Sequence, residues 1–406
     1  MKMQVRGPLI WVLLVFYIFG HIFISHNNGF VEAKSSSKFE DLEIENELKT
    51  INKPAVMIIK TIQGEQYGCV DFFKQPAFDH PSMKNHTYHY KMRPIWNGMR
   101  ERKKNNTANG FGYLWENGVG CPIGTVPIKR VTKDELLRLH SLDDNYKPRG
   151  SWSTTTCDPT YDVHYDQHHY AVGRTRKKGM VYNGATMELC ITAPKVKPTQ
   201  FSHSRLYIQM GDDFIQTGVA VNPVLYNDNQ PRVFVYTKAG AKSCYNSQCD
   251  VGMISVRQDF PMGTELKPVS IRGAKQSRYE TFGLIKDQAN GNWWLEFGSK
   301  AEEIGFWPSN RFGQSSGNYV EWGGEVYSAS LPSPEMGYGY FLEYDIIYDA
   351  YVKHIFILDA NHKFDRSVDY VESFSDDKRG YQAYNTIYSG YPDAGHIILY
   401  GGPGNI

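Results

Sequence analysis

Three histidines, His164, His168 and His169, lie close enough in the sequence to raise the question of a metal site. A four-residue spacing would put two imidazoles on one face of a helix. Zinc normally takes at least three protein ligands, and no cysteine or carboxylate completes a convincing set here. The residues around the histidines are aromatic and β-branched, which favours a strand over a helix. We therefore expect neither a metal site nor a cofactor.

Six cysteines are present, and their chemistry depends on the compartment in which the chain folds. In an oxidising compartment they predict disulfide bonds. The predicted pairs are Cys244–Cys249, which close a short turn, Cys69–Cys121, both in the N-terminal region, and Cys157–Cys190, which are paired by elimination.

The N-terminus has the features of a secretory signal peptide. Lys2 and Arg6 form a basic start, residues 10–24 are mostly apolar, and small residues around Ala33 suit cleavage. We expect a signal peptide over residues 1–33 and a secreted protein, free of the membrane after cleavage. The apolar stretch is slightly long for a signal, so an uncleaved membrane anchor is the alternative.

Two sequons fit this secreted setting. Asn85-His86-Thr87 and Asn105-Asn106-Thr107 match the acceptor pattern for N-glycosylation. Such sites lie on exposed loops of secreted proteins, so Asn85 and Asn105 are predicted glycosylation sites.

The composition and charge indicate which partner is not expected and which fold class is expected. Across 406 residues, 44 basic and 43 acidic side chains give a net charge of +1, and no basic stripe supports nucleic-acid binding. Many short runs rich in β-branched and aromatic residues lie between turn residues, for example residues 207–210, 232–237, 283–286, 292–297 and 354–358. This pattern predicts a mostly β protein with a sandwich or barrel.

The first part of the chain differs from this pattern. Residues 37–40 have capping-box spacing ahead of a short helix, residues 55–62 form an apolar run of strand length, and Thr132 opens a second capping box. The chain then turns polar between His140 and Gly150, which marks a boundary. We expect a smaller mixed α+β region at 34–150 and a β-sandwich domain at 151–406.

Two groups of motifs resemble the neprosin family of plant glutamic peptidases. The run Gln75-Pro76-Ala77-Phe78-Asp79-His80-Pro81 and the stretch around Cys121-Pro122 resemble its activation peptide. Trp293-Trp294, residues 304–308, Trp322-Gly323-Gly324-Glu325-Val326 and Gly401-Gly402-Pro403-Gly404 resemble its catalytic domain. The resemblance implies an antiparallel β-sandwich and an acid-active endopeptidase of the apoplast or cell wall that cuts after proline. Together with the polar boundary between His140 and Gly150, it predicts that residues 34–150 are a propeptide that acts as an inhibitor in cis.

The resemblance also assigns the catalytic positions, and one of them departs from the family. Glu325 matches one catalytic glutamate, whereas Gln216 stands where the family has the other. Nearby, Val219, Arg205 and Tyr207 replace Trp, Gln and Trp. Two facing carboxylates can share one proton, which suits acid chemistry.

Glutamine cannot titrate, but its amide can donate a hydrogen bond to an oxyanion, so Glu325 would serve alone as the base. That division resembles the fungal glutamic peptidases, which use one Gln and one Glu.

Two functions therefore stay open. The first is a glutamic-type endopeptidase acting on a peptide or protein substrate with Gln216 and Glu325. The second is an inactive relative that binds peptide or cell-wall carbohydrate in the same cleft. For either, the aromatic residues predicted to line the cleft are Trp293, Trp294, Trp307, Trp322 and Tyr207.

Overall fold

The computed structural model describes residues 41–94, 110–142, 144–152, 167–175, 179–366, 368, 370–387 and 395–406. The predicted signal peptide, Asn105, Cys157 and His164 lie outside these residues. Among the described helices, none is both long enough and apolar enough to cross a membrane.

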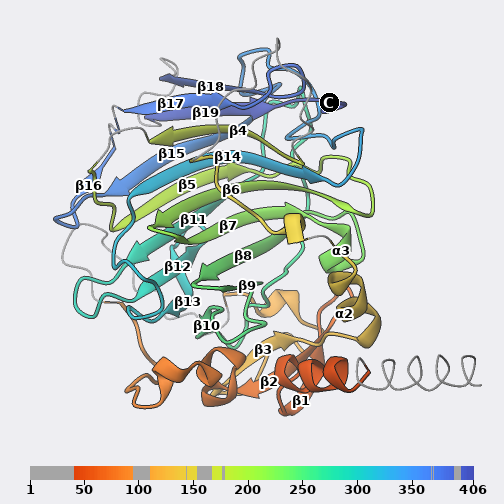
Figure 1. Ribbon diagram of the computed structural model, residues 1–406, viewed down its shortest axis with the longest axis vertical. Helices are drawn as coiled ribbons and strands as arrows, with labels where there is room; N and C mark the ends of the chain where they lie inside the picture. Colours follow the sequence, from red (N-terminus) through yellow and green to blue (C-terminus); the bar gives the residue numbers. More distant parts are fainter. Residues whose placement is uncertain are drawn as a thin grey trace, which may run out of the picture. The chain divides into compact units, whose positions relative to one another are not determined.

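Two antiparallel sheets form the body of the chain, as the alternating sequence pattern predicts (Figure 1). The seven-stranded sheet has the order β17-β4-β14-β6-β7-β8-β9. Its strands are β4 (His168–Thr175), β6 (Gln200–Met210), β7 (Asp213–Val221), β8 (Arg232–Ala239), β9 (Lys242–Tyr245), β14 (Tyr319–Ser328) and β17 (Val371–Ser375).

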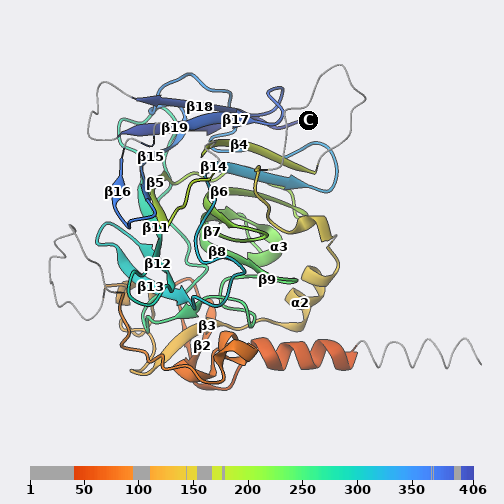
Figure 2. The ribbon, with the colours of Figure 1, turned by 60° about the vertical axis from the view of Figure 1, so that its left-hand side comes forward.

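The nine-stranded sheet has the order β10-β13-β12-β11-β5-β15-β19-β18, with β16 paired to β15. Its strands are β5 (Gly184–Cys190), β10 (Ile254–Ser255), β11 (Tyr279–Lys286), β12 (Trp293–Phe297), β13 (Glu302–Trp307), β15 (Ala350–Leu358), β16 (Phe364–Asp365), β18 (Gln382–Ile387) and β19 (His396–Gly401). Figure 2 separates the two layers: β5, β11, β12 and β13 lie in one, and β6, β7, β8 and β14 in the other.

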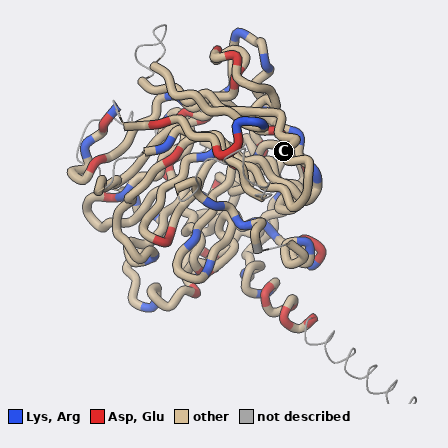
Figure 3. Tube along the Cα trace, turned by 45° about the horizontal axis from the view of Figure 1, so that its top comes forward, with Lys and Arg blue, Asp and Glu red and all other residues tan. Residues whose placement is uncertain are grey.

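The core lies between the two sheets because alternate residues of each strand point inward. Leu206 and Ile208 of β6, Ile215 of β7, and Val320 and Val326 of β14 are fully buried in it. The residues between them on the same strands face the other side of the seven-stranded sheet. Acidic and basic positions are interspersed along the strands and loops (Figure 3).

The N-terminal region is mixed α+β, as expected. Residues 41–51 are helical, and a separate antiparallel sheet has the order β1-β2-β3. Its strands are β1 (Ala55–Lys60), β2 (Gln66–Asp71) and β3 (Thr125–Lys129). Short 3-10 turns are η1 (Phe72–Lys74), η2 (Pro76–Asp79), η3 (Pro81–Met83), η4 (Gly112–Leu114) and η5 (Asp144–Tyr146).

Two further helices are α2 (Lys133–His140) and α3 (Pro223–Tyr226). The predicted capping box is present at α2: the Thr132 side chain accepts from the Glu135 amide, and the Glu135 carboxylate accepts from the Thr132 amide.

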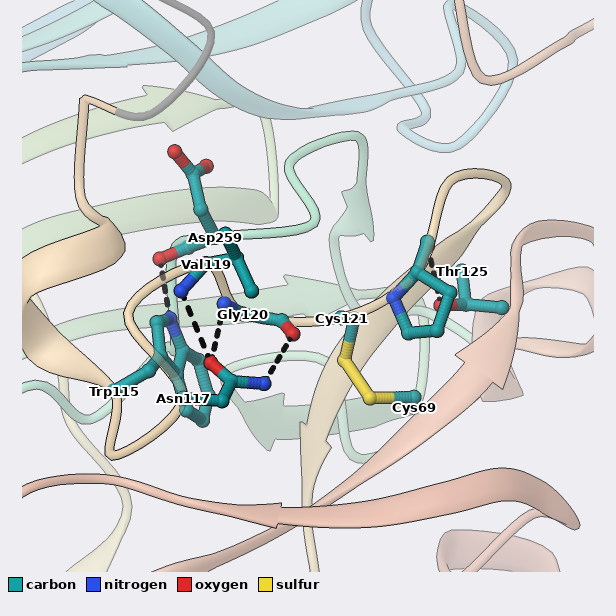
Figure 4. The surroundings of a disulfide bond; sticks show 9 residues. Cys69, Trp115, Asn117, Val119, Gly120, Cys121, Thr125 and Asp259 are labelled. Carbon is teal, nitrogen blue, oxygen red and sulfur yellow. Dashed lines mark hydrogen bonds between the residues drawn. A yellow bond between two sulfur atoms is a disulfide. The ribbon is translucent and has the colours of Figure 1, made fainter.

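Two of the three predicted disulfides are confirmed. Cys244 is bonded to Cys249, and Cys69 to Cys121. Figure 4 shows the second bond beside a turn in which Asn117 accepts from two backbone amides. The third pairing is wrong: Cys190 is a free thiol, buried between the sheet and Ser270, and Cys157 lies outside the described residues.

Candidate active site

Glu325 and Gln216 lie on two strands of the seven-stranded sheet that are separated by β6. Glu325 belongs to β14 and Gln216 to β7, and both side chains point away from the core. Arg205 of β6 lies between them, on the same face. The register places Arg205 directly opposite Gly218 of β7 and Gly323 of β14.

The two residues meet as the family resemblance implies, although 109 residues separate them in sequence. The Gln216 amide Nε2 donates to Glu325 Oε2 over 3.1 Å. Arg205 Nε donates to the same oxygen over 2.8 Å, and its Nη2 lies 3.5 Å from Glu321 Oε1. All four side chains are completely buried.

Two glycines make room for this cluster. Gly218 and Gly323 have φ values of +153° and +136°, a region that side chains rarely adopt. A Cβ at Gly323 would lie 2.5 Å from the Ala171 carbonyl oxygen, and one at Gly218 would overlap the Ser204 carbonyl. Because neither neighbour of Arg205 carries a side chain, the guanidinium can reach Glu325 and Glu321.

Glu325 is held as a carboxylate. Burial raises its pKa, but the charge of Arg205 and a hydrogen bond from His168 outweigh burial and lower the pKa to about 2. His168 Nδ1 lies 3.2 Å from Glu325 Oε1, and its Nε2 lies 2.6 Å from the Asn145 carbonyl oxygen.

His203 is a second histidine at the site, and sequence reasoning did not select it. It lies opposite Glu325 in the register and packs between Phe201 and Phe234, with ring centroids at 4.0 and 4.5 Å. Burial lowers its pKa to about 3, which keeps the ring neutral. Neither ring nitrogen has a partner among the described residues. The only indication of His203 in the sequence was its spacing: it lies two residues from both Phe201 and Arg205, so the three side chains point to the same face of β6.

A segment of the N-terminal region lies across this cluster. The Arg149 amide donates to Glu325 Oε1 over 2.7 Å. The Arg149 carbonyl accepts from Gln216 Nε2 over 2.9 Å and from Arg205 Nη2 over 3.2 Å. The site therefore binds both backbone polar groups of Arg149: a carboxylate accepts from its N–H, and an amide and a guanidinium donate to its C=O.

The predicted aromatic lining is mostly wrong. Trp293, Trp307 and Trp322 are buried in the core between the sheets, and Trp294 packs under Phe72 of the N-terminal region. The reason is strand alternation: every second residue of β12, β13 and β14 faces the opposite sheet. Tyr207 is the exception, because its ring lies on the site face directly beneath Gly150.

The histidines of β4 cannot share a metal ion. His168 points towards Glu325, whereas its neighbour His169 points to the other side of the strand and hydrogen-bonds to Asp376 over 2.8 Å. Consecutive residues of a strand face opposite ways. Within the described ranges, no three side chains of metal-binding type form a cluster.

The chain was compared with solved structures and with models of protein families. Two solved chains of scytalido-glutamic peptidase, one with a peptide-based transition state analog and one with a transition state analog inhibitor, are 6% identical to this chain. Each match covers 58% of this chain and 98% of the other, with TM-scores of 0.32 and 0.33, too low to support an argument. The model of the Neprosin activation peptide matches residues 58–174, and the Neprosin model matches residues 198–403. The second match alone spans half of the sequence, and the chain belongs to the Neprosin family.

Proposed function

We propose that this chain is the precursor of a secreted glutamic-type endopeptidase. In it, Glu325 is the general base, and Gln216 and Arg205 bind the carbonyl that is attacked. The observation that carries the proposal is the bound backbone of Arg149, whose carbonyl accepts from both donors while its N–H donates to the carboxylate. The residues that hold it are buried, so their geometry is fixed before a substrate arrives.

The reaction needs three steps from these groups. Glu325 takes a proton from a water molecule as the water oxygen adds to the carbonyl carbon. Gln216 and Arg205 stabilise the negative charge that forms on the carbonyl oxygen; one such donor is worth about 3–4 kcal/mol in other enzymes. Glu325 then gives the proton to the leaving nitrogen as the C–N bond breaks.

The bound segment has the properties of a cis inhibitor rather than a substrate. The Arg149 N–H occupies the Glu325 oxygen that the attacking water would need. A proline at this position has no N–H and would leave that oxygen free. Cleavage after proline, which the family resemblance implies, thus has a physical basis in this site. Linkage to the rest of the chain also gives the segment a high effective concentration.

Arg205 changes the reason for which hydrolysis would depend on acid. A shared proton between two carboxylates would require acid, but here the base is one carboxylate with a pKa of about 2. We expect that acid, where it promotes hydrolysis, acts by loosening the Arg149 segment and not by preparing the base.

A second function is favoured by one observation. Both oxygens of Glu325 already accept hydrogen bonds, from Arg205 and Gln216 on one side and from Arg149 and His168 on the other. A base so fully engaged suits a peptide-binding protein that lacks hydrolytic activity. A carbohydrate ligand loses its support because the predicted tryptophans are buried.

Hydrolysis by the recombinant full chain separates the two functions. The chain is incubated at pH 3 to 7 with a library of proline-containing peptides, beside Glu325→Gln and the control Glu116→Gln, which changes an exposed glutamate. We expect cleavage by the wild type and the control, and none by Glu325→Gln with an unchanged circular dichroism spectrum. No cleavage by any form, once gel electrophoresis shows that the N-terminal region has been cut away, would make the binding protein the better account.

A further inference from the structure

The contacts of the bound segment continue beyond Arg149 to Ser151; we call the residues that surround the segment the cleft, and those that contact Ser151 the pocket. This serine is completely buried, and both of its donors reach one carboxylate. Its amide donates to Glu321 Oε1 and its hydroxyl to Glu321 Oε2, each over 2.8 Å. Arg174 Nη1 donates to the Ser151 carbonyl over 2.9 Å and lies 3.3 Å from its hydroxyl. The pocket therefore meets every polar group of this residue.

The charged residues of the pocket are held in place by other partners. Glu321 is completely buried beside Arg205, and Arg174, 6% exposed, bonds to Glu372 over 2.7 Å and lies over the Phe374 ring. An alanine in place of the serine would leave a buried carboxylate oxygen without this donor. From the usual cost of such a loss, we expect binding to weaken about ten- to a hundredfold.

The preceding position accepts only glycine. A Cβ on Gly150 would lie 2.6 Å from the Tyr207 hydroxyl oxygen and 2.7 Å from its Cε1. Tyr207 is itself completely buried, with its ring against Phe214 at a centroid distance of 4.9 Å. The ring has little room to move aside, so any side chain at this position would clash with it.

We propose that this cleft selects peptides with Gly-Ser directly after the residue whose carbonyl is bound by Gln216 and Arg205. Tyr207 sets the requirement for glycine and Glu321 the requirement for serine. The natural ligand is then an extended peptide with a Gly-Ser pair, and for hydrolysis one with proline just before it. Only this last, hydrolytic part rests on the proposed function; selective binding does not.

Binding to the full chain tests the proposal once the cis segment is displaced. Gly150→Ala adds a Cβ that clashes with the Tyr207 ring, and this displaces the cis segment from the cleft. The probe is a fluorescent peptide with the sequence of residues 146–152, compared by anisotropy with two variants that carry alanine for the glycine or for the serine. We expect the parent peptide to bind at least tenfold tighter than either. Equal affinities, or no binding of the parent peptide, would overturn the proposal.

Two further chains assign the roles. Glu321→Gln is made in the Gly150→Ala background, whereas Tyr207→Ala is combined with Ser151→Ala, because without the Tyr207 ring an alanine at position 150 would no longer displace the cis segment. Adding Tyr207→Ala should abolish discrimination against the alanine-for-glycine peptide and keep discrimination at the serine. Adding Glu321→Gln should abolish discrimination against the alanine-for-serine peptide and keep discrimination at the glycine. If Glu321→Gln does not fold, as judged by its melting curve, the Tyr207→Ala chain alone decides: preference for glycine that persists there refutes the assignment.

Mass spectrometry with versions of the three peptides that carry proline in place of Arg149 keeps the two proposals apart. Selective binding of proline peptides that stay intact would refute hydrolysis and uphold the Gly-Ser selectivity. Cleavage of the proline parent peptide and both of its variants at equal rates would uphold hydrolysis and refute the selectivity.

Discussion

Replacing Arg205 with glutamine should destabilise the protein in a manner that depends steeply on pH. Glu325 has its pKa lowered from an ordinary value of 4.5 to about 2, despite complete burial. At about 1.4 kcal/mol for each pKa unit, this lowering is worth on the order of 3 kcal/mol. Breaking a buried ion pair by removing one partner typically costs about 3–5 kcal/mol. We therefore expect Arg205→Gln to lose about 3–5 kcal/mol of unfolding free energy at pH 7.

The sign of the pH effect follows from the two states of Glu325. In the wild type, the folded carboxyl has the lower pKa, so its stabilisation is complete above pH 4.5 and is lost as the pH falls towards 2. In Arg205→Gln, burial is no longer opposed by the guanidinium charge, so the pKa of Glu325 rises and the folded state takes up a proton more readily. The difference in unfolding free energy between the two chains should therefore shrink from pH 7 to pH 3.

Urea unfolding at several pH values between 3 and 7 measures this difference. The matched control is Arg232→Gln, which removes a buried arginine paired with Asp228 at 2.6 Å and Glu65 at 2.9 Å, both partly exposed. Its destabilisation should vary less with pH, because the charge on Glu325 is untouched. A constant difference for Arg205→Gln over this range would show that the charge of Arg205 does not hold Glu325 ionised.

Two other predictions concern single side chains. Gln216→Glu puts a second carboxyl about 3 Å from Glu325, and since two carboxyl groups this close share a proton, the pH optimum of hydrolysis should shift from that of the wild type. An unchanged profile would place Gln216 outside the chemistry. Cys190 is buried, which raises its thiol pKa, so iodoacetamide at pH 8 should label it only after unfolding; rapid labelling of the native chain, or a Cys157–Cys190 peptide in a non-reducing map, would contradict the structure.

The sequence predicts local features, which depend only on residues that are close together along the chain. The strand over 232–237 appears within β8 because its β-branched and aromatic residues suit a sheet. The Thr132 capping box and the Cys244–Cys249 loop likewise need only a few residues on either side. The family resemblance added Gln216 and Glu325 as a pair, because their flanking motifs identify the positions.

Features that depend on strand register could not be read in this way. Arg205 stood out only as a departure from the family, and its contact with Glu325 follows from the pairing of β6 with β14. Trp293 and Trp294 look alike in the sequence, yet one faces the core and the other Phe72, because adjacent strand residues point to opposite sides. The Cys157–Cys190 pairing failed because it assumed that every cysteine forms a disulfide.

The position of β4 limits where the precursor can be processed. The activation-peptide match runs to residue 174, yet residues 168–175 form a strand paired with both β14 and β17, and His168 contacts Glu325. A protease that removed residues up to 174 would take out part of the sheet, so we expect the maturation cut before His168. The excised piece would keep its own Cys69–Cys121 cross-link, and among the described cysteines no bond ties it to the sheets. If it inhibits as proposed, the cut piece would become a separate inhibitor that can dissociate, and dilution of the protein would itself promote activation.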